Sequence, residues 1–219
     1  MSDWTDRRIF AVGDIHGCLN HLRELIRILP IRKERDRFVF IGDYIDRGFE
    51  SQGVVDYVRF LETNLCETVC LMGNHEQMFL DYLEGRNKEM FLCNGGLETL
   101  ISYGLHDRKR VSPADLPTGH LVFFRNLRPY YEQDGFILVH AGLRPGVSLS
   151  VQSLDDLLWI RFEFINNDFD FGQTVIFGHT PLSKTIPFYG KKKIGIDTGA
   201  VYGGRLTCLE LPSMTLYQV

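Results

Sequence analysis

The sequence predicts an α/β fold of mixed sheets, and three observations carry this prediction. Short apolar runs rich in β-branched and aromatic residues recur along the chain, as is typical of buried strands. Amphipathic segments with helical spacing lie between several of these runs. The segment 184–219 differs, because its strand-like runs are separated only by turns. Strands that alternate with helices indicate an α/β fold, and the last segment adds antiparallel strands.

Each predicted strand of the alternating part ends in a tight polar loop. The loops begin with or contain glycine, which lets the backbone turn sharply just past a strand. In α/β folds, ligands bind outside the carboxyl ends of the strands, so these loops can converge on one place. The predicted strands cover residues 8–12, 37–41, 68–72, 136–139 and 174–177.

Three helices are predicted between the strands. Residues 20–30 carry apolar side chains at positions i, i+3, i+4 and i+7, and Pro30 closes the segment. Residues 51–62 have similar spacing. Residues 75–85 end on Gly85, which suits a helix C-cap.

The C-terminal part is predicted to form successive hairpins. Its candidate strands are residues 185–189, 193–197, 205–211 and 215–219. Because no linker or composition shift divides the chain, a single domain over residues 1–219 is predicted.

Composition excludes several classes of protein. The chain has 219 residues, of which 24% are charged, and a formal net charge of −4. This balance gives no electrostatic footprint for nucleic acid or for an anionic membrane. No apolar stretch approaches the roughly 20 residues of a membrane span, and the N-terminus does not read as a secretory signal. The five cysteines include no CxxC pair, which favours free thiols in a reducing compartment. We therefore expect a cytoplasmic monomer without nucleic-acid or membrane partners.

The polar loops carry side chains that bind metals. Carboxylate, imidazole and amide oxygen are ligands for divalent ions such as Mn, Fe and Zn. A single Asp or His at a strand end is usually a cap or a hydrogen-bonded core residue. It is improbable that five successive strands would all end this way by independent chance. Six such groups exceed the needs of one tetrahedral ion and suit two ions that share a carboxylate. They are Asp14, His16, Asp43, Asn74, His140 and His179.

The loop motifs also resemble a known family. The motifs GDIHG, GDYIDRG, GNHE, HAG and GHT occur in this order between positions 13 and 180. Together they resemble the phosphoprotein phosphatase family of calcineurin-like metallophosphoesterases. The stretch IDTGAVYGGRLT near the end is similar to the small bacterial serine/threonine phosphatase branch. The resemblance implies a four-layer αββα sandwich, in which two stacked mixed β-sheets flanked by helices hold a dinuclear metal centre.

The resemblance assigns the ligands to two metal ions. Asp14 and His16 would bind the first ion, and Asp43 would bridge both. The second ion would also take Asn74, His140 and His179. Mn²⁺ is the expected metal, and the same ligands accept Fe or Zn.

Four further residues are implied as catalytic groups that do not bind metal. A hydroxide that bridges the metals would attack phosphorus in line, and His75 would protonate the leaving oxygen as general acid. Asp46 would hydrogen-bond His75 and favour its charged form. Arg47, and Arg161 in the segment LLWIRFEF, would bind the phosphate, because a guanidinium makes two parallel hydrogen bonds to it.

Three functions remain open from the sequence. The leading one is a serine/threonine protein phosphatase acting on phosphorylated proteins. The second is a hydrolase of diadenosine tetraphosphate or other small phosphoesters, a branch that typically lacks the Asp46–Arg47 pair. The third is a catalytically silent phosphate-binding module, which the presence of His75, Asp46 and Arg47 speaks against. The segment FLCNGG resembles part of the bacterial branch and would border the cleft, although a helix-capping turn explains it equally well.

Overall fold

The computed structural model describes residues 7–184 and 187–219, which form two five-stranded mixed sheets. In the first sheet the strand order is β10-β9-β1-β2-β3, and in the second it is β4-β5-β6-β8-β7. The strands are β1 (Ile9–Val12), β2 (Arg37–Phe40), β3 (Glu67–Cys70), β4 (Tyr130–Gln133), β5 (Phe136–Val139), β6 (Thr174–Phe177), β7 (Phe188–Gly190), β8 (Lys193–Gly195), β9 (Thr207–Leu211) and β10 (Thr215–Gln218).

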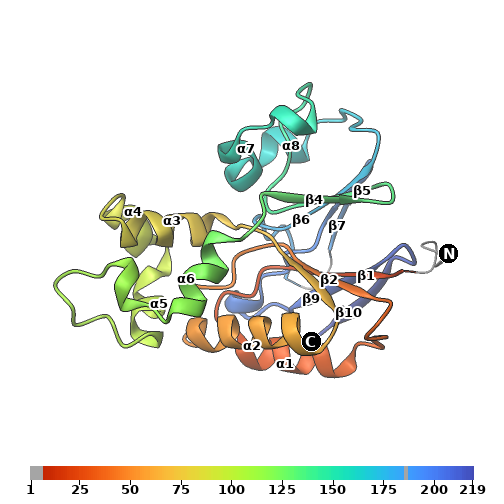
Figure 1. Cartoon of the computed structure of the whole chain (residues 1–219). Coiled ribbons are helices and arrows are strands. Elements are labelled where there is room, and N and C mark those ends of the chain that lie inside the picture. The colour runs from red at the N-terminus through yellow and green to blue at the C-terminus, as the bar shows by residue number, and fades with distance from the viewer. Residues whose placement is uncertain (1–6, 185–186) are drawn as a thin grey trace.

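Helices cover both outer faces of the pair of sheets (Figure 1). Helices α1 and α2 lie against the first sheet, α7 and α8 against the second, and α3 to α6 gather at one end. The α-helices are α1 (Leu19–Ile28), α2 (Ser51–Asn64), α3 (Asn74–Leu83), α4 (Lys88–Phe91), α5 (Leu97–Ser102), α6 (Thr118–Arg125), α7 (Leu154–Trp159) and α8 (Phe162–Ile165). A π-helical turn, η2 (Leu92–Gly96), and the 3₁₀ turns η3 (Pro113–Asp115), η4 (Leu149–Val151) and η5 (Ala200–Tyr202) complete the chain.

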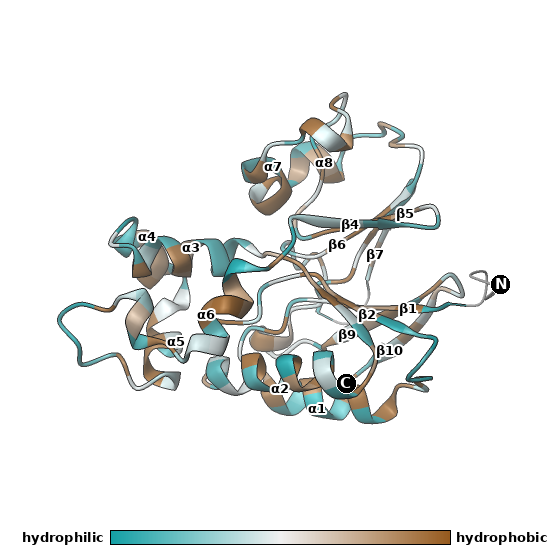
Figure 2. Cartoon of the chain, viewed as in Figure 1, coloured by the Kyte–Doolittle hydropathy of each residue, from teal (hydrophilic) through white to brown (hydrophobic). Residues whose placement is uncertain are grey.

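The apolar core follows from this layering. Side chains alternate across a strand, so β1 sends Phe10 and Val12 toward the helices and Ile9 and Ala11 toward the second sheet. A third cluster packs the outer face of the second sheet against α7 and α8. Apolar and polar residues alternate along α1 and α2, as expected for helices with one buried face (Figure 2). The three apolar layers between four layers of structure confirm the predicted αββα arrangement.

The alternating part of the fold agrees with the sequence prediction. The five predicted strands correspond to β1, β2, β3, β5 and β6, and the three predicted helices to α1, α2 and α3, with ends that differ by at most two residues. Strands β1, β2 and β3 pair in parallel, so their carboxyl ends lie at one edge. In the second sheet, β5 and β6 also pair in parallel.

The C-terminal hairpins are confirmed only in part. Strands β7 and β8 form one antiparallel pair, and β9 and β10 form another. The predicted hairpin between residues 193–197 and 205–211 is wrong, because β8 pairs with β6 while β9 crosses to the first sheet and pairs with β1. Part of the predicted strand 185–189 lies outside the described residues. No helix within the described ranges has the length and apolar character needed to cross a membrane.

Candidate active site

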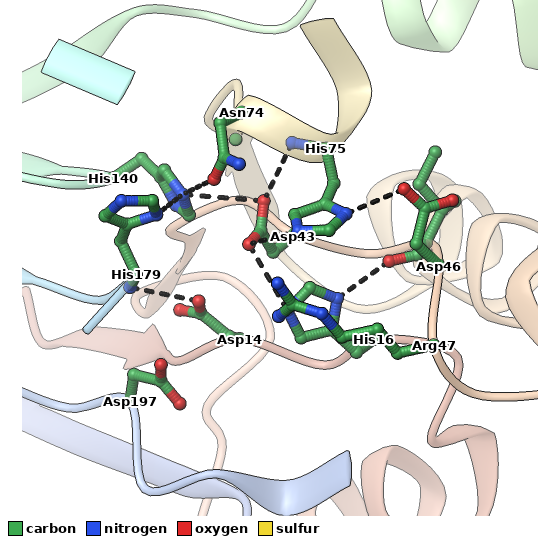
Figure 3. Close-up of polar contacts among 12 residues, drawn as sticks. Asp14, His16, Asp43, Asp46, Arg47, Asn74, His75, His140, His179 and Asp197 are labelled. Atoms are coloured by element: carbon green, nitrogen blue, oxygen red, sulfur yellow. Dashed lines mark hydrogen bonds and ion pairs between the residues drawn. The ribbon is translucent and has the colours of Figure 1, made fainter. Parts of the chain in front are cut away.

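The loops after β1, β2, β3, β5 and β6 meet at one edge of the two sheets. They bring nine of the ten predicted site residues together (Figure 3). The tenth, Arg161, lies at the rim and donates to the backbone carbonyl of His179 at 3.1 Å. The metal-ligand candidates are all buried: Asp14, His16, Asp43, Asn74, His140 and His179.

Asp43 lies at the centre of the cluster. Its Oδ2 is 3.3 Å from His16 Nε2, and its Oδ1 is 3.4 Å from His140 Nε2. Burial alone would raise the pKa of Asp43, but its close contacts with the imidazoles of His140, His75 and His16 outweigh burial and hold the pKa well below its ordinary value. The carboxylate therefore faces two separate groups of nitrogen ligands, one on each oxygen.

His140 shows how the second group is built. Its Nδ1–H donates to the carbonyl of Ile41 at 2.9 Å, which leaves Nε2 with a free lone pair. That nitrogen lies 2.9 Å from Asn74 Oδ1 and 3.2 Å from His179 Nδ1. Burial lowers the pKa of His140 and lowers that of His179 to about 2, so both imidazoles stay neutral. Neutral imidazoles and an amide oxygen that face a carboxylate form a set of acceptors suited to a cation.

The first group is arranged around His16 and Asp14. His16 Nδ1–H donates to the carbonyl of Ile45 at 2.8 Å, so its Nε2 faces Asp43. Asp14 Oδ2 accepts the backbone N–H of His179 at 3.0 Å. Burial and the neighbouring carboxylates Asp197 and Asp43 raise the pKa of Asp14 well above its ordinary value. A cation placed here would remove this cost, because it would interact with all of the carboxylates.

Several buried polar atoms at this site have no hydrogen-bond partner. Among the described residues they include Asp14 Oδ1, His75 Nε2 and His179 Nε2. One set of possible ligand atoms comes from His16, Asp43 and His75, and a second set comes from Asp43, His140 and His179. Within each set the atoms all lie within 4.8 Å of one another, and Asp43 belongs to both sets. The orphaned Asp14 Oδ1 and two sets of ligand atoms that share a carboxylate fit a pair of divalent ions, because a buried carboxylate oxygen otherwise requires a partner. His75 is also engaged elsewhere, which separates it from the ligands.

His75 and Asp46 form a buried pair beside the cluster. His75 Nδ1 lies 2.7 Å from Asp46 Oδ2, and both side chains are fully buried. Burial raises the pKa of Asp46 to about 8 and lowers the pKa of His75 to about 3. Both pKa shifts disfavour an ion pair between an Asp46 carboxylate and a His75 imidazolium, because each charged group would be buried. Burial thus works against the charged imidazolium that the sequence predicts for His75.

Arg47 lies over the first group of ligands. Its Nη1 donates to His16 Nε2 at 2.5 Å, and its guanidinium lies 5.5 Å from the centre of the Tyr202 ring. The guanidinium therefore lies next to the lone pair that a first metal would use, and this contact has to open when His16 binds a metal. Arg161 approaches from the other side, where it also donates to Thr180 Oγ1 at 3.2 Å.

The loop backbones are held in conformations that the sequence does not reveal. Five site residues have positive φ, with values between 45° and 69°: His16, Asp43, Asp46, Arg47 and His179. Such conformations cost roughly 1–3 kcal/mol each for residues other than glycine. Glu76 offsets part of this cost, since its buried carboxylate accepts the backbone N–H groups of Asp43, Tyr44, Ile45 and Gly73 at 2.8–3.3 Å.

Two contributors to the site, Asp197 and Thr99, were not predicted, and for a third, Gly95, the sequence left the role open. Asp197 follows β8 and faces Asp14 (Figure 3); its signal was the acid at the end of the apolar run KIGID, the same pattern as in the other loops. Thr99 hydrogen-bonds Asp46 from α5, and nothing in its sequence context indicated this. Gly95 of the FLCNGG segment accepts the backbone N–H of Arg47 at 3.0 Å, so this segment does border the site.

The fold and the cluster of ligands are those of a metallophosphoesterase. The sequence profile of the calcineurin-like phosphoesterase family matches residues 7–195, which include every predicted site residue. The chain belongs to this family, as predicted.

Particular relatives differ in the substrates that their names give. The chain is 31% identical over 210 residues to serine/threonine-protein phosphatase 1 of Salmonella typhimurium, covering 94% of this chain and 92% of that protein. It is 27% identical over 240 residues to the bis(5'-nucleosyl)-tetraphosphatase PrpE of Geobacillus thermodenitrificans, covering 96% and 93%. A cold-active protein tyrosine phosphatase shares the fold at a TM-score of 0.70 and 19% identity, covering 96% of this chain and 78% of that chain. The relatives thus agree on phosphoester chemistry and divide over the substrate.

Proposed function

We propose that this protein is a metal-dependent phosphomonoesterase that removes phosphate from serine or threonine in proteins. The observation that carries the proposal is the buried His75–Asp46 pair, 2.7 Å between Nδ1 and Oδ2, beside the shared carboxylate of Asp43. A proton donor next to a dinuclear site meets both demands of phosphoester hydrolysis, which are a nucleophile and a protonated leaving group. A phosphate-binding module without turnover would not require this pair.

The residues around Asp43 would hold the two ions. Asp14, His16 and Asp43 would bind one, and Asp43, Asn74, His140 and His179 the other. When bound, two divalent ions supply a nucleophile from water near neutral pH and neutralise the charge on phosphate. We propose Mn²⁺ as the ion, since the mixed carboxylate, amide and imidazole set accepts it.

His75 would deliver the proton to the leaving oxygen. Its Nε2 has no hydrogen-bond partner among the described residues and lies 3.9 Å from Asp43 Oδ2, so it faces the centre of the site. As Nε2 gives up its proton, the proton held between Nδ1 and Asp46 can shift toward Nδ1. The ring then stays neutral, which is favourable in a buried position.

Arg47 and Arg161 would bind the phosphate oxygens. They approach the ligand cluster from opposite sides, with Arg47 near His16 and Arg161 near His179. Guanidinium groups remain charged and match the geometry of phosphate oxygens. A phosphate held between them would place its ester oxygen toward His75.

A hydrolase of dinucleoside tetraphosphates is the second candidate. It is supported by the 27% identity to the bis(5'-nucleosyl)-tetraphosphatase PrpE over nearly the whole of both chains. Both reactions use the same site chemistry, so the choice depends on measured rates. The Asp46–Arg47 pair favours the phosphomonoesterase.

The test is hydrolysis of p-nitrophenyl phosphate by protein stripped with chelator and then titrated with Mn²⁺. We expect activity to vanish and return, followed by a higher kcat/KM on phosphoserine peptides than on diadenosine tetraphosphate. The reverse preference would establish the second candidate. Two bound ions without turnover of any of these substrates would overturn both.

We also propose a reducing, cytoplasmic location. All five cysteines are free thiols: Cys18, Cys66, Cys70, Cys93 and Cys208. Burial raises the pKa of Cys66 and Cys18 to about 11, which makes these thiols unreactive.

A further inference from the structure

Asp46 and Arg47 form a strained dipeptide at the centre of the proposed chemistry. Their φ values are 69° and 68°, so two consecutive residues with side chains adopt the left-handed conformation. Such a conformation persists only where surrounding contacts hold it. Two of the residues that make these contacts, Gly95 and Thr99, lie in one short segment, the end of η2 and the start of α5, and Ser51 of α2 adds a third contact.

Gly95 holds the backbone of Arg47. Its carbonyl accepts the Arg47 N–H at 3.0 Å, and its own φ is 93°. A Cβ at this position would lie 2.8 Å from Arg47 Cγ and 2.9 Å from Arg47 N, so only glycine allows this approach. Asn94 and Gly95 have non-helical backbone angles, so the chain kinks at this point and brings the Gly95 carbonyl to Arg47.

Thr99, one helical turn further along, holds Asp46. Its hydroxyl donates to Asp46 Oδ1 at 2.6 Å and accepts the Asp46 N–H at 2.8 Å. Its Oγ1 also lies 3.0 Å from Ser51 Oγ, which accepts the same N–H at 3.1 Å. Thr99, Ser51 and Asp46 are all fully buried. The two oxygens of the Asp46 carboxylate are therefore divided, Oδ1 to Thr99 and Oδ2 to His75.

We propose that Thr99 is a positioning residue for the proton donor, acting on His75 through Asp46. With Oδ1 fixed by Thr99, the carboxylate cannot rotate, and Oδ2 stays directed at His75 Nδ1. The imidazole then keeps Nε2 facing the centre of the site. The inference rests on the proposed function, since it assigns a role within the same proton transfer.

The hydrogen bonds of Thr99 distinguish a role in orienting Asp46 from a role in filling space. A threonine needed only to fill space would be replaced by valine without loss, because the two side chains have nearly the same shape. Valine, however, leaves Asp46 Oδ1 buried without a donor, and a buried acceptor without a partner is costly. The carboxylate can recover a partner only by rotating away from His75. Serine at this position keeps the hydroxyl and removes only a methyl group.

The first experiment compares Thr99→Val and Thr99→Ser on two substrates with different leaving groups. We expect Thr99→Val to lower kcat on an alkyl phosphate about 10- to 50-fold, a part of the roughly 10²–10⁴-fold worth of a general acid. On p-nitrophenyl phosphate, whose leaving group needs little protonation, the loss should stay within about 3-fold. KM should change little, and Thr99→Ser should retain most of the activity on both substrates.

Thr68→Val is the matched control. Thr68 lies on β3, is partly buried, and donates to the carbonyl of Cys66 at 2.9 Å. Thr68→Val removes one hydroxyl outside the site, so kcat on the alkyl phosphate and on p-nitrophenyl phosphate should be unchanged. Equal losses on both substrates in Thr99→Val, or a serine variant as impaired as the valine variant, would overturn the positioning role.

A second readout does not depend on turnover. The proton in the hydrogen bond between His75 Nδ1 and Asp46 Oδ2 should give a far-downfield NMR signal in the wild-type protein, assigned by its absence in His75→Asn. We expect Thr99→Val to shift or broaden this signal and Thr99→Ser to preserve it. If the wild-type protein hydrolyses no phosphoester, the proposed function fails, and the NMR comparison still decides whether Thr99 orients the pair. An unchanged signal in Thr99→Val rules the inference out.

Discussion

His75 differs from the other imidazoles of the site in the partner of its Nδ1. His16 and His140 donate Nδ1–H to backbone carbonyls, which leaves the Nε2 of each available to a metal ion. His75 instead faces the carboxylate of Asp46, which can exchange a proton with it. A carbonyl cannot compensate a change of charge on the ring, whereas a carboxylate can. We therefore expect the partner of Nδ1 to distinguish the proposed proton donor from the proposed metal ligands.

This distinction predicts the effect of His75→Asn. The variant should keep its metal content, while kcat falls by roughly 10²–10⁴-fold. The loss should be smaller for leaving groups of low pKa, because these depart without protonation. Rates on p-nitrophenyl and alkyl phosphates, with metal analysis of both proteins, provide the measurement. An equal loss on the two substrates would contradict a role in proton donation.

Asp43 predicts a different outcome when it is changed. Its two oxygens face separate groups of ligands, at 3.3 Å and 3.4 Å from the nearest imidazole nitrogens. Asp43→Asn replaces one carboxylate oxygen by an amide NH2 group, which cannot bind a cation. We expect both ions to bind more weakly, which metal analysis after dialysis would measure. Retention of two ions per chain would remove the bridging assignment.

At the scale of elements, one buried carboxylate joins the starts of two neighbouring strands. Asp36, just before β2, accepts hydrogen bonds from the Arg8 side chain at 2.6 Å and 3.1 Å and from the backbone N–H of Arg32 at 2.6 Å. Burial alone would raise the pKa of Asp36, but the bonds from Arg8 and Arg32 outweigh it and lower the pKa. Its stabilising effect is complete above the unfolded-state pKa of about 3.9 and disappears as the pH falls through the lower folded value.

Asp36→Asn should therefore reduce the free energy of unfolding at pH 7 by roughly 1–3 kcal/mol. The difference from the wild-type protein should narrow as the pH falls below about 4, because Asp36 of the unfolded wild-type chain then takes up a proton while the folded carboxylate is still ionised. Urea unfolding between pH 7 and pH 3.5 measures both effects. Asp170→Asn, which breaks an exposed ion pair with Lys192, is the control and should change stability little at any pH. A difference that stays constant over this range would contradict the assignment.

The elements also show which parts of the structure could be predicted from sequence. The units that end in Asp14, Asp43 and His140 were predictable, because a short buried strand and the glycine loop after it are both local. The path from β8 to β9 was not predictable. The partner of a strand depends on which sheet has a free edge for it, and local sequence patterns do not contain this information. Thr99 was missed for a similar reason: its partner, Asp46, lies 53 residues away. The positive φ of site residues such as Asp43 likewise depends on distant contacts, here with Glu76.

At the scale of the whole molecule, the proposed metal centre connects the two sheets. Asp14 and Asp43 follow strands of the first sheet, whereas His140 and His179 follow strands of the second. Ions bound at this edge would link the sheets at their carboxyl ends. Binding to the folded state alone stabilises it by about 2.7 kcal/mol per site when the free ion is at 100 times its dissociation constant.

Mn²⁺ should therefore raise the melting temperature of the stripped protein by about 5–10 °C per occupied site. Calorimetry with chelator and with Mn²⁺ measures the shift. In Asp43→Asn the shift should largely disappear at the same Mn²⁺ concentration. An equal shift in the variant would show that the ion stabilises the protein from another place.

Strand β1 lies between β2 and β9 in the first sheet, although β9 ends only at Leu211. During synthesis at about 5–20 residues per second, β1 and β2 leave the ribosome well before the strand that covers the other edge of β1. The nascent chain thus exposes an unpaired edge of apolar residues for roughly 10–30 s, and such an edge recruits other chains. Because a late strand lies beside the first one, we expect chaperone contact in this interval and aggregation of chains cut off before Thr207.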